Sequence, residues 1–138
     1  MAITRTTSVI NDLLDGLDAV FNSGLLDIYS GTAPATANLA VTGTLLAQIT
    51  LPADSFAAAT AAAKAKNGTW QDSSANATGT PGYFRLKTSG DTNANTQNER
   101  RVDGSVTLTG NGGDMTVDSM SFTAGQVFTV TAFNLTGA

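Results

Sequence analysis

Residues 25–52 restrict the possible fold of this chain more than any other part of the sequence. Leu26 and Ile28 alternate with their neighbours in the first part of this segment, and a second alternating run extends from Leu46 to Thr50. Alternation with a period of two is typical of β-strands. The connection between the two runs carries no charge and contains the glycine, proline, serine and threonine residues that favour turns. The segment therefore predicts two strands joined by a turn-rich loop.

Four later segments predict further short strands, at residues 82–88, 102–108, 115–122 and 127–135. In the first of these, alternation places Phe84 and Leu86 on one side of the sheet. The opposite side receives Tyr83, Arg85 and Lys87. Each segment lies next to glycine-containing or polar residues, as expected for short strands joined by turns and loops.

Turn signals separate these predicted strands. Asn67-Gly68 predicts a type I′ hairpin turn that leads into Trp70, which we interpret as a core or interface residue. Residues 111–114 and 124–126 predict two further turns. The apolar parity of the segment that starts at Met115 shifts along its length, which predicts a bulge near Asp118. Residues 53–66 leave two interpretations open, because their alanine content favours a helix whereas their position among strands favours an extended run.

Residues 8–22 predict a helix, because apolar side chains recur there at helical spacing. Thr6, Thr7 or Ser8 can cap its start, and Ser23-Gly24 supplies the stop. The apolar stripe consists of Ile10, Leu13, Leu14, Leu17, Val20 and Phe21. We expect Leu13, Leu14 and Leu17 to be buried against the sheet or against a neighbouring molecule. Away from the stripe lie Asp12, Asp15 and Asp18, which form either a solvated face or a docking stripe for a basic partner.

These elements predict one all-β domain. Its 138 residues are enough for a core that needs no disulfide or metal. The predicted architecture is an antiparallel β-sandwich or partly closed barrel of about seven strands with one N-terminal amphipathic helix. Residues 1–24 form the helical segment, and residues 25–138 form the β part of this single domain.

Composition excludes several classes of function. The formal net charge of −4 and the scattered seven Lys and Arg residues argue against nucleic-acid binding. We expect no membrane contact and no secretory signal, because no apolar stretch is long enough for either. Only 13% of the residues are charged, about half of the usual share. A surface with so little charge indicates that neighbouring molecules cover part of it.

The sequence favours no enzymatic activity, no cofactor and no metal site. Without histidine or cysteine, it has neither the usual nucleophile pairs nor the usual zinc ligands. Carboxylate catalysis would need Glu99 beside Asp91, or Asp114 beside Asp118, and the spacing of these residues does not require either pair. Asp91, Asn93 and Asn95 imitate the start of a calcium-binding loop. The imitation lacks the glycine and the final glutamate of such loops, so we interpret it as an Asx-rich turn.

The polar segment at residues 89–100 is predicted to be a long loop, because it contains no aliphatic residue larger than alanine. We expect it to contribute little to the stability of the domain and to be either a binding element or mobile. Its amide and charged side chains are candidates for contacts with a neighbouring molecule. Together with the residue that follows the loop, these interface candidates are Asn93, Asn95, Gln97, Glu99, Arg100 and Arg101.

Five short motifs follow one another along the chain, and their order carries a resemblance to known proteins. They are Ile28-Tyr29-Ser30-Gly31-Thr32-Ala33-Pro34-Ala35, Leu45-Leu46-Ala47, Tyr83-Phe84-Arg85, Asp103-Gly104-Ser105-Val106 and Ala124-Gly125-Gln126. In this order the chain resembles small tailed-bacteriophage proteins encoded among head and tail structural genes. Residues 57–66 and 89–100 depart from that pattern. The resemblance implies a non-enzymatic virion structural protein, either an accessory or decoration protein of the head or a neck-collar component.

The resemblance also implies partners and a location. The partners would be copies of the chain itself and other virion proteins, namely the major capsid protein or the portal and neck proteins. The location would be the virion, assembled in the host cytoplasm. Two alternatives stay open. A carbohydrate- or receptor-binding module of a phage tail would need an exposed aromatic platform, for which Trp70 and Tyr83 are the large candidates. A small hydrolase would need two close carboxylates in a cleft.

Overall fold

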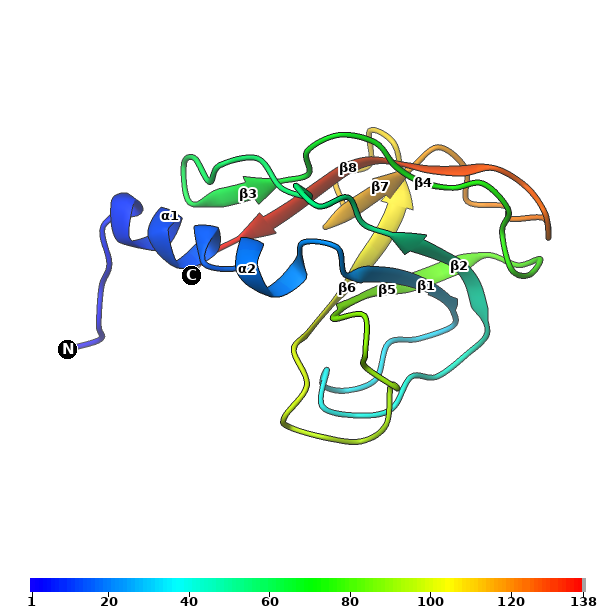
Figure 1. Cartoon of the computed structure of the whole chain (residues 1–138), viewed down its shortest axis with the longest axis horizontal. Helices are drawn as coiled ribbons and strands as arrows, with labels where there is room; N and C mark the ends of the chain where they lie inside the picture. Colours follow the sequence, from blue (N-terminus) through cyan, green and yellow to red (C-terminus); the bar gives the residue numbers. More distant parts are fainter. Residues whose placement is uncertain (138) are drawn as a thin grey trace.

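The computed structural model describes residues 1–137 as a curled β-sheet with a helical segment at its N-terminal end (Figure 1). An extended N-terminal arm, residues 1–6, precedes the first helix. The elements in chain order are α1 (Thr7–Asp15), α2 (Asp18–Phe21), β1 (Leu25–Ser30), β2 (Leu45–Thr50), β3 (Ala63–Ala65), β4 (Trp70–Asp72), β5 (Pro81–Lys87), β6 (Arg101–Leu108), β7 (Met115–Val117) and β8 (Phe128–Thr136).

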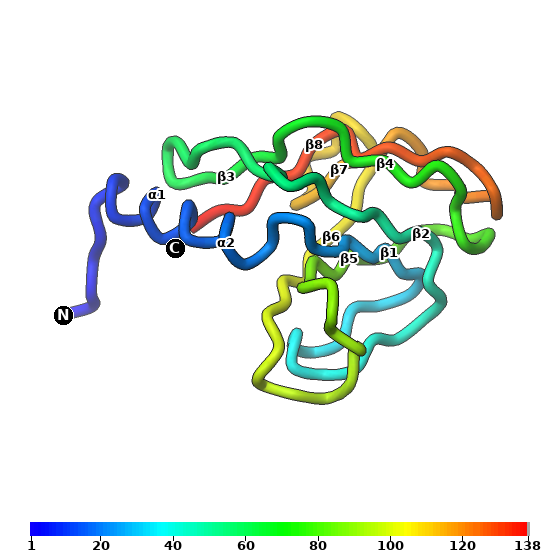
Figure 2. Tube along the Cα trace, viewed as in Figure 1, coloured from blue at the N-terminus to red at the C-terminus, as the bar shows by residue number. Residues whose placement is uncertain are grey.

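The strands form one sheet in the order β2-β1-β5-β6-β7-β8-β3, and β4 also pairs with β8. The sheet curls until the free edge of β2 approaches β4 and the chain that follows it (Figure 2). There the Asn76 N–H donates to the Leu46 carbonyl at 2.8 Å, and the Gln48 N–H donates to the Asp72 carboxylate at 3.1 Å. The predicted all-β fold with a partly closed barrel and an N-terminal helix is therefore confirmed.

One strand pair departs from the antiparallel prediction, because β6 and β7 run parallel. A parallel pair normally needs a crossover of a dozen or more residues, but here residues 109–114 suffice. The chain doubles back along β6, with Gly110 and Gly112 at positive φ. The Thr107 hydroxyl then accepts from the Gly113 N–H at 2.9 Å. Side-chain bonds to the returning loop thus replace the hairpin that the turn residues predict.

The core fills the inside of the curled sheet with apolar side chains. Leu26 and Ile28 of β1 lie against Phe84 and Leu86 of β5 across the strand pairing, and all four are buried. The ring of Trp70 is fully buried and lies 5.1 Å from the ring of Phe133 between centroids. Trp70 is therefore a core residue, as predicted.

The helical segment is interrupted at Gly16-Leu17, so that α1 and the single turn α2 replace one continuous helix. The Thr6 side chain accepts from the Val9 N–H and caps α1. Of the three leucines expected to be buried, Leu14 is buried and Leu17 is partly buried, but Leu13 is 61% exposed. The expectation for Leu13 is wrong within this chain because α1 projects beyond the sheet and contacts it along one side only (Figure 1).

Residues 53–66 are extended, so their helix propensity does not decide the structure. Thr60 and Ala63 exchange two backbone hydrogen bonds of 2.9 Å around a tight turn. Both central residues of that turn, Ala61 and Ala62, have positive φ angles of 51° and 60°. The Asn11 side chain of α1 accepts from the Ala62 N–H at 2.9 Å and holds this hairpin against the helix.

Two further local predictions need correction. Asn67-Gly68 does not join paired strands, because β3 and β4 each pair with β8 instead of with each other. Only Gly68 of the two has the positive φ that a type I′ turn requires at both positions. The strand expected at residues 115–122 ends at Val117, and its register shift lies between Thr116 and Val117, next to the predicted position near Asp118. β7 has three residues and pairs with β6 on one side and with β8 on the other.

The turn at Ala61 and Ala62 yields a stability prediction. Alanine in the left-handed region costs roughly 1–2 kcal/mol per residue, whereas asparagine and glycine tolerate it. Ala61→Asn combined with Ala62→Gly should raise the free energy of unfolding by about 1 kcal/mol, measured by urea denaturation. The matched control is Ala58→Gly at an exposed position without positive φ, which should lower stability by about 0.5 kcal/mol. Equal effects in both variants would contradict the turn geometry.

Candidate functional site

The outer face of β1, β5 and β6 carries polar and charged side chains that two long loops cover. The loops are residues 31–44, between β1 and β2, and residues 88–100, between β5 and β6. Strand pairing places Asp27 opposite Arg85, and Arg85 opposite Asp103. Asp27, Arg85 and Lys87 are buried although they point away from the core. We call the surface formed by these two loops the loop face.

A charged cluster beneath the loop face fixes both loops. The Lys87 Nζ lies 2.9 Å from the Asp27 carboxylate. The Arg101 guanidinium donates two hydrogen bonds of 2.5 and 2.6 Å to the carboxylate of Asp91. The Asn93 amide donates to the Tyr29 hydroxyl at 3.1 Å, and that hydroxyl donates to Asp27. Charge-assisted bonds of this kind are stronger than neutral ones, so the cluster connects β1, β5, β6 and the second loop.

The two loops are also joined to each other. The Ala40 N–H donates to the Asn95 side chain at 2.6 Å, and the Thr96 N–H donates to the Asn38 carbonyl at 2.8 Å. The Tyr83 hydroxyl donates to the Thr42 carbonyl and accepts from the Thr42 N–H. The loop at residues 89–100 is thus bonded to the domain by polar contacts, and its small contribution to stability stays a prediction.

The protonation states of the charged cluster suit a fixed support for the two loops. Burial raises the pKa of Asp91, but hydrogen bonds from Arg101 and from the Asn93 N–H outweigh burial, so this pKa lies below its ordinary value. Burial raises the pKa of Tyr29, and the charge of Asp27 raises it further. Near pH 7 the carboxylate is therefore ionised and the phenol is neutral. Both groups keep one protonation state and hold the loops.

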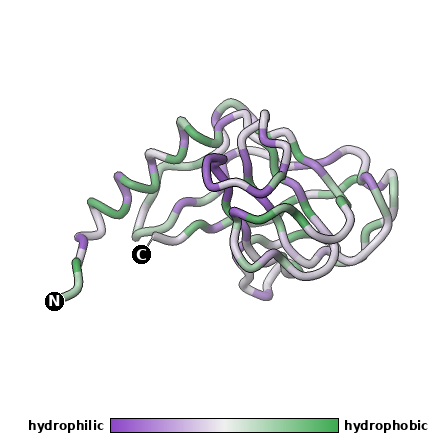
Figure 3. Tube along the Cα trace, turned by 90° about the horizontal axis from the view of Figure 1, so that it is seen from below, coloured by the Kyte–Doolittle hydropathy of each residue, from purple (hydrophilic) through white to green (hydrophobic). Residues whose placement is uncertain are grey.

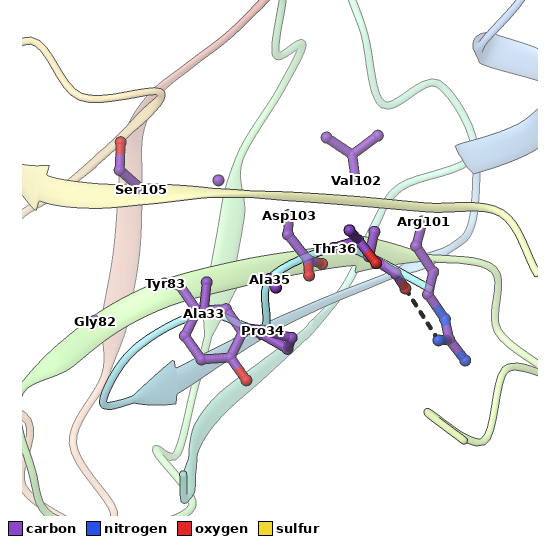
Figure 4. A pocket seen from close by; sticks show the side chains of 12 residues that line it. Ala33, Pro34, Ala35, Thr36, Gly82, Tyr83, Arg101, Val102, Asp103 and Ser105 are labelled. Atoms are coloured by element: carbon purple, nitrogen blue, oxygen red, sulfur yellow. Dashed lines mark hydrogen bonds between the residues drawn. The ribbon is translucent and has the colours of Figure 1, made fainter. Parts of the chain in front are cut away.

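An open groove lies between the first loop and β6 (Figure 4). It encloses about 510 Å³ and is lined by Ala33, Pro34, Ala35, Thr36, Ala37, Gly82, Tyr83, Arg101, Val102, Asp103, Gly104 and Ser105. Small side chains form one wall. On the other wall the Asp103 carboxylate is already occupied by two bonds of 2.8 Å from Arg85. The groove therefore has room for a ligand, but few of the charged side chains that line it lack a partner within the chain.

The acidic residues of the helical segment lie in two environments. Asp15 and Asp18 approach the buried Lys64 of β3 at 2.6 and 3.1 Å. The hydrogen bond from Lys64, together with one from the Ala59 N–H, lowers the pKa of Asp15. Asp12 is exposed. Two of the three predicted docking carboxylates therefore pair with a lysine of their own chain, and the sequence alone could not show this because 49 residues separate Asp15 from Lys64.

The interface candidates of the second loop also form two groups, one bonded within the chain and one exposed. Asn93, Asn95 and Arg101 make contacts within the chain. Gln97, Glu99 and Arg100 are exposed and stay candidates for an intermolecular contact. Sequence analysis missed Asp27 and Lys87 as members of the charged cluster. The available signal was the alternation in β5, which places Lys87 on the face opposite the core.

Apolar side chains are exposed on the N-terminal arm and on α1. Ile3 is 83% exposed, Val9 is 46% exposed and Leu13 is 61% exposed. Val9 and Leu13 are four residues apart on one helix and so lie on the same face. Figure 3 shows that this part of the chain projects from the sheet. We call Met1, Ile3, Val9 and Leu13 the N-terminal apolar surface.

The polar motif that imitates a calcium loop is a turn. The Asn93 N–H donates to the Asp91 side chain at 2.7 Å, as in an Asx-turn. Within residues 1–137, no group of three or more acidic, histidine or cysteine side chains is placed to hold a metal ion. In the same part of the chain, no helix has the length and apolar character needed to cross a membrane.

Comparisons with known proteins return no match: no family model, no curated protein and no solved structure matches this chain.

The Asp91 pair yields a pH prediction. Removing one partner of a buried ion pair costs about 3 kcal/mol or more, so Asp91→Asn should lower the free energy of unfolding at pH 7 by about that amount. A lowered carboxyl pKa gives stability that is present above the ordinary value of 3.8 and is lost as the pH falls through the folded value. The variant should therefore lose less stability than the original chain below about pH 4.

Chemical denaturation between pH 2 and 7 measures both effects. Asp12→Asn is the matched control, because Asp12 is exposed and its replacement should change stability by less than about 0.5 kcal/mol. Parallel stability curves for the original chain and Asp91→Asn would show that the pair does not couple loop docking to protonation.

Proposed function

We propose that this chain is a non-enzymatic virion structural protein of a tailed bacteriophage. It assembles as an oligomer on the particle, as an accessory or decoration protein of the head or as a neck-collar component. Its partners are copies of itself and the major capsid protein or the portal and neck proteins. It works in the virion after assembly in the host cytoplasm, with no cofactor, nucleic acid or membrane as a partner.

The N-terminal apolar surface is the observation that carries this proposal. A soluble chain gains free energy when exposed leucine, isoleucine and valine side chains leave water, at about 25 cal/mol per Å². Leu13 and Val9 cannot reach the core of their own domain, because α1 projects beyond the sheet. A neighbouring molecule can cover them, as expected for a subunit of a larger assembly.

Two further features support an assembly role. The charged cluster fixes the loop face in one conformation, so that binding there loses little conformational entropy. Of the seven Lys and Arg residues, Lys64, Arg85, Lys87 and Arg101 are held in internal ion pairs. The chain has 11 Asp and Glu residues against seven Lys and Arg residues, and this negative balance disfavours contact with phosphate backbones.

The alternative of a carbohydrate- or receptor-binding module has less support. Such a module stacks sugar rings on exposed aromatic faces, and the two large candidates are buried, with 0% exposure for Trp70 and 1% for Tyr83. The groove of about 510 Å³ beside the loop face is large enough for a small ligand. It presents small side chains in place of an aromatic platform.

Replacing Val9 and Leu13 by serine together tests the proposed function. Both side chains are exposed, so the variant should unfold within about 1 kcal/mol of the original chain. It should sediment as a monomer at tens of micromolar, where the original chain forms an oligomer that buries more than about 1,000 Å² per contact. It should also fail to enter particles assembled in its presence.

Leu14→Ala is the matched control on the same helix. Leu14 is buried, so this change should cost about 2–5 kcal/mol of stability, in contrast to the surface variant. The proposal is wrong if the original chain is a strict monomer at these concentrations and does not bind particles that lack it.

A further inference from the structure

Four dipeptides in this sequence place an asparagine or an aspartate directly before a glycine. They are Asp15-Gly16, Asn67-Gly68, Asp103-Gly104 and Asn111-Gly112. In such a pair the backbone nitrogen of the glycine can attack the side-chain carbonyl carbon of the preceding residue, because glycine has no Cβ to hinder the approach. The attack requires a side chain that is free to turn towards this nitrogen. The structure therefore decides which of the four pairs can react.

Both aspartate pairs are held in place by cations. The Asp15 carboxylate accepts a hydrogen bond of 2.6 Å from Lys64. The Asp103 carboxylate accepts two hydrogen bonds of 2.8 Å from Arg85. An ionised carboxylate is also a weaker electrophile than a neutral amide, because its negative charge repels the attacking nitrogen. The two asparagine pairs are therefore the sites to compare.

The two asparagine pairs have nearly the same backbone surroundings. Asn67 and Asn111 are both exposed. The glycines that follow them have φ angles of 71° and 74°, and no atom lies within 4 Å of the position that a Cβ would take at either glycine. Within residues 1–137, neither glycine N–H donates a hydrogen bond to the chain. The attacking nitrogen is thus equally available in the two pairs.

The side-chain amides of the two asparagines differ. The Asn67 amide donates hydrogen bonds to the Asp54 carboxylate at 3.1 Å and to the Asp54 carbonyl at 3.2 Å. Both bonds must be released before this amide can turn towards the nitrogen of the next residue. In the described part of the chain, the Asn111 side chain has no hydrogen-bond partner. Asn111 is therefore free to approach the nitrogen of Gly112.

We propose that Asn111 is a site of spontaneous deamidation, with water as the co-reactant. The Gly112 nitrogen forms a bond to the Cγ atom of Asn111 and loses its proton, while the Cγ–Nδ2 bond breaks and ammonia leaves. Water then opens the cyclic imide. Opening at Cγ gives aspartate, and opening at the backbone carbonyl gives isoaspartate, in which the main chain runs through the former side chain. The inference does not depend on the proposed function.

Both products change the connection between β6 and β7. Each replaces a neutral amide by a carboxylate and so adds one negative charge to a chain with a formal net charge of −4. Isoaspartate also adds one carbon atom to the main chain, between two hydrogen bonds that fix the turn. The Asn111 N–H donates to the Leu108 carbonyl at 3.0 Å, and the Gly113 N–H donates to the Thr107 hydroxyl at 2.9 Å.

Ageing of the intact, folded chain at neutral pH tests the inference. Trypsin separates the two sites, because Asn67 falls in the peptide of residues 67–85 and Asn111 in the peptide of residues 102–138. Mass spectrometry with fragmentation measures the conversion of amide to carboxylate at each position. Asn111 should deamidate about tenfold faster than Asn67, because two hydrogen bonds must be released at Asn67. In urea, where both amides are free, the two rates should become similar.

Asp54→Ala isolates the effect of the bonds at Asn67. Asp54 is exposed, and the change removes the carboxylate that holds the Asn67 amide. Asn67 should then deamidate about fivefold faster, while the rate at Asn111 stays unchanged. Asn111→Gln is the matched control, because glutamine keeps the amide but forms the cyclic imide far more slowly. A carboxyl methyltransferase specific for isoaspartate should label the aged original chain more strongly than the aged Asn111→Gln chain.

Thermal unfolding of each variant confirms that its fold is retained, and the comparison of the two sites within the original chain needs no variant. Equal rates at Asn67 and Asn111 in the folded chain, or a faster reaction at Asn67, would overturn the inference. An Asn111 that stays unmodified in the folded chain but reacts in urea would overturn it as well.

Discussion

Burial of charge on the outer face of β5 is the constraint on which the rest of this structure depends. Arg85 and Lys87 are fixed by strand alternation on the face opposite the core, and both are almost completely buried. A buried cation without a partner is strongly destabilising, so each needs a carboxylate. Asp103 and Asp27 supply these partners from the adjacent strands. Two loops without large apolar anchors then fold over the pairs, and Asp91 with Arg101 fastens the second loop.

Two kinds of interaction, which we call the two supports, therefore stabilise the domain: apolar packing inside the sheet and polar bonds outside it. Inside the curled sheet, aromatic and aliphatic side chains exclude water without directional bonds. Outside it, ion pairs and side-chain to backbone bonds fix two polar loops in register with each other. Only part of the N-terminal segment belongs to either support, since only one side of α1 contacts the sheet. Its exposed face is a place where the fold leaves apolar side chains uncovered.

The candidate site could be predicted only in part from the sequence. The loop at residues 89–100 is recognisable by its composition, and its predicted contacts with a neighbouring molecule stay a prediction. The partners of those residues are not recognisable. Asn95 binds the backbone of Ala40, and Lys64 binds the Asp15 carboxylate of α1, across 55 and 49 residues of sequence respectively. Such contacts depend on where the sheet brings distant loops together, and the residue types involved are equally common on solvated surfaces.

The sequence by itself determined the positions of most strands, the N-terminal helix and the all-β class, because alternation and capping are local properties of a few consecutive residues. It also determined that Phe84 and Leu86 share one face of their strand. Only the tertiary structure decided that β6 and β7 run parallel, that the alanine-rich residues 53–66 are extended and that Leu13 is exposed. Each of these outcomes depends on long-range packing, whose free energy exceeds the small differences in local propensity.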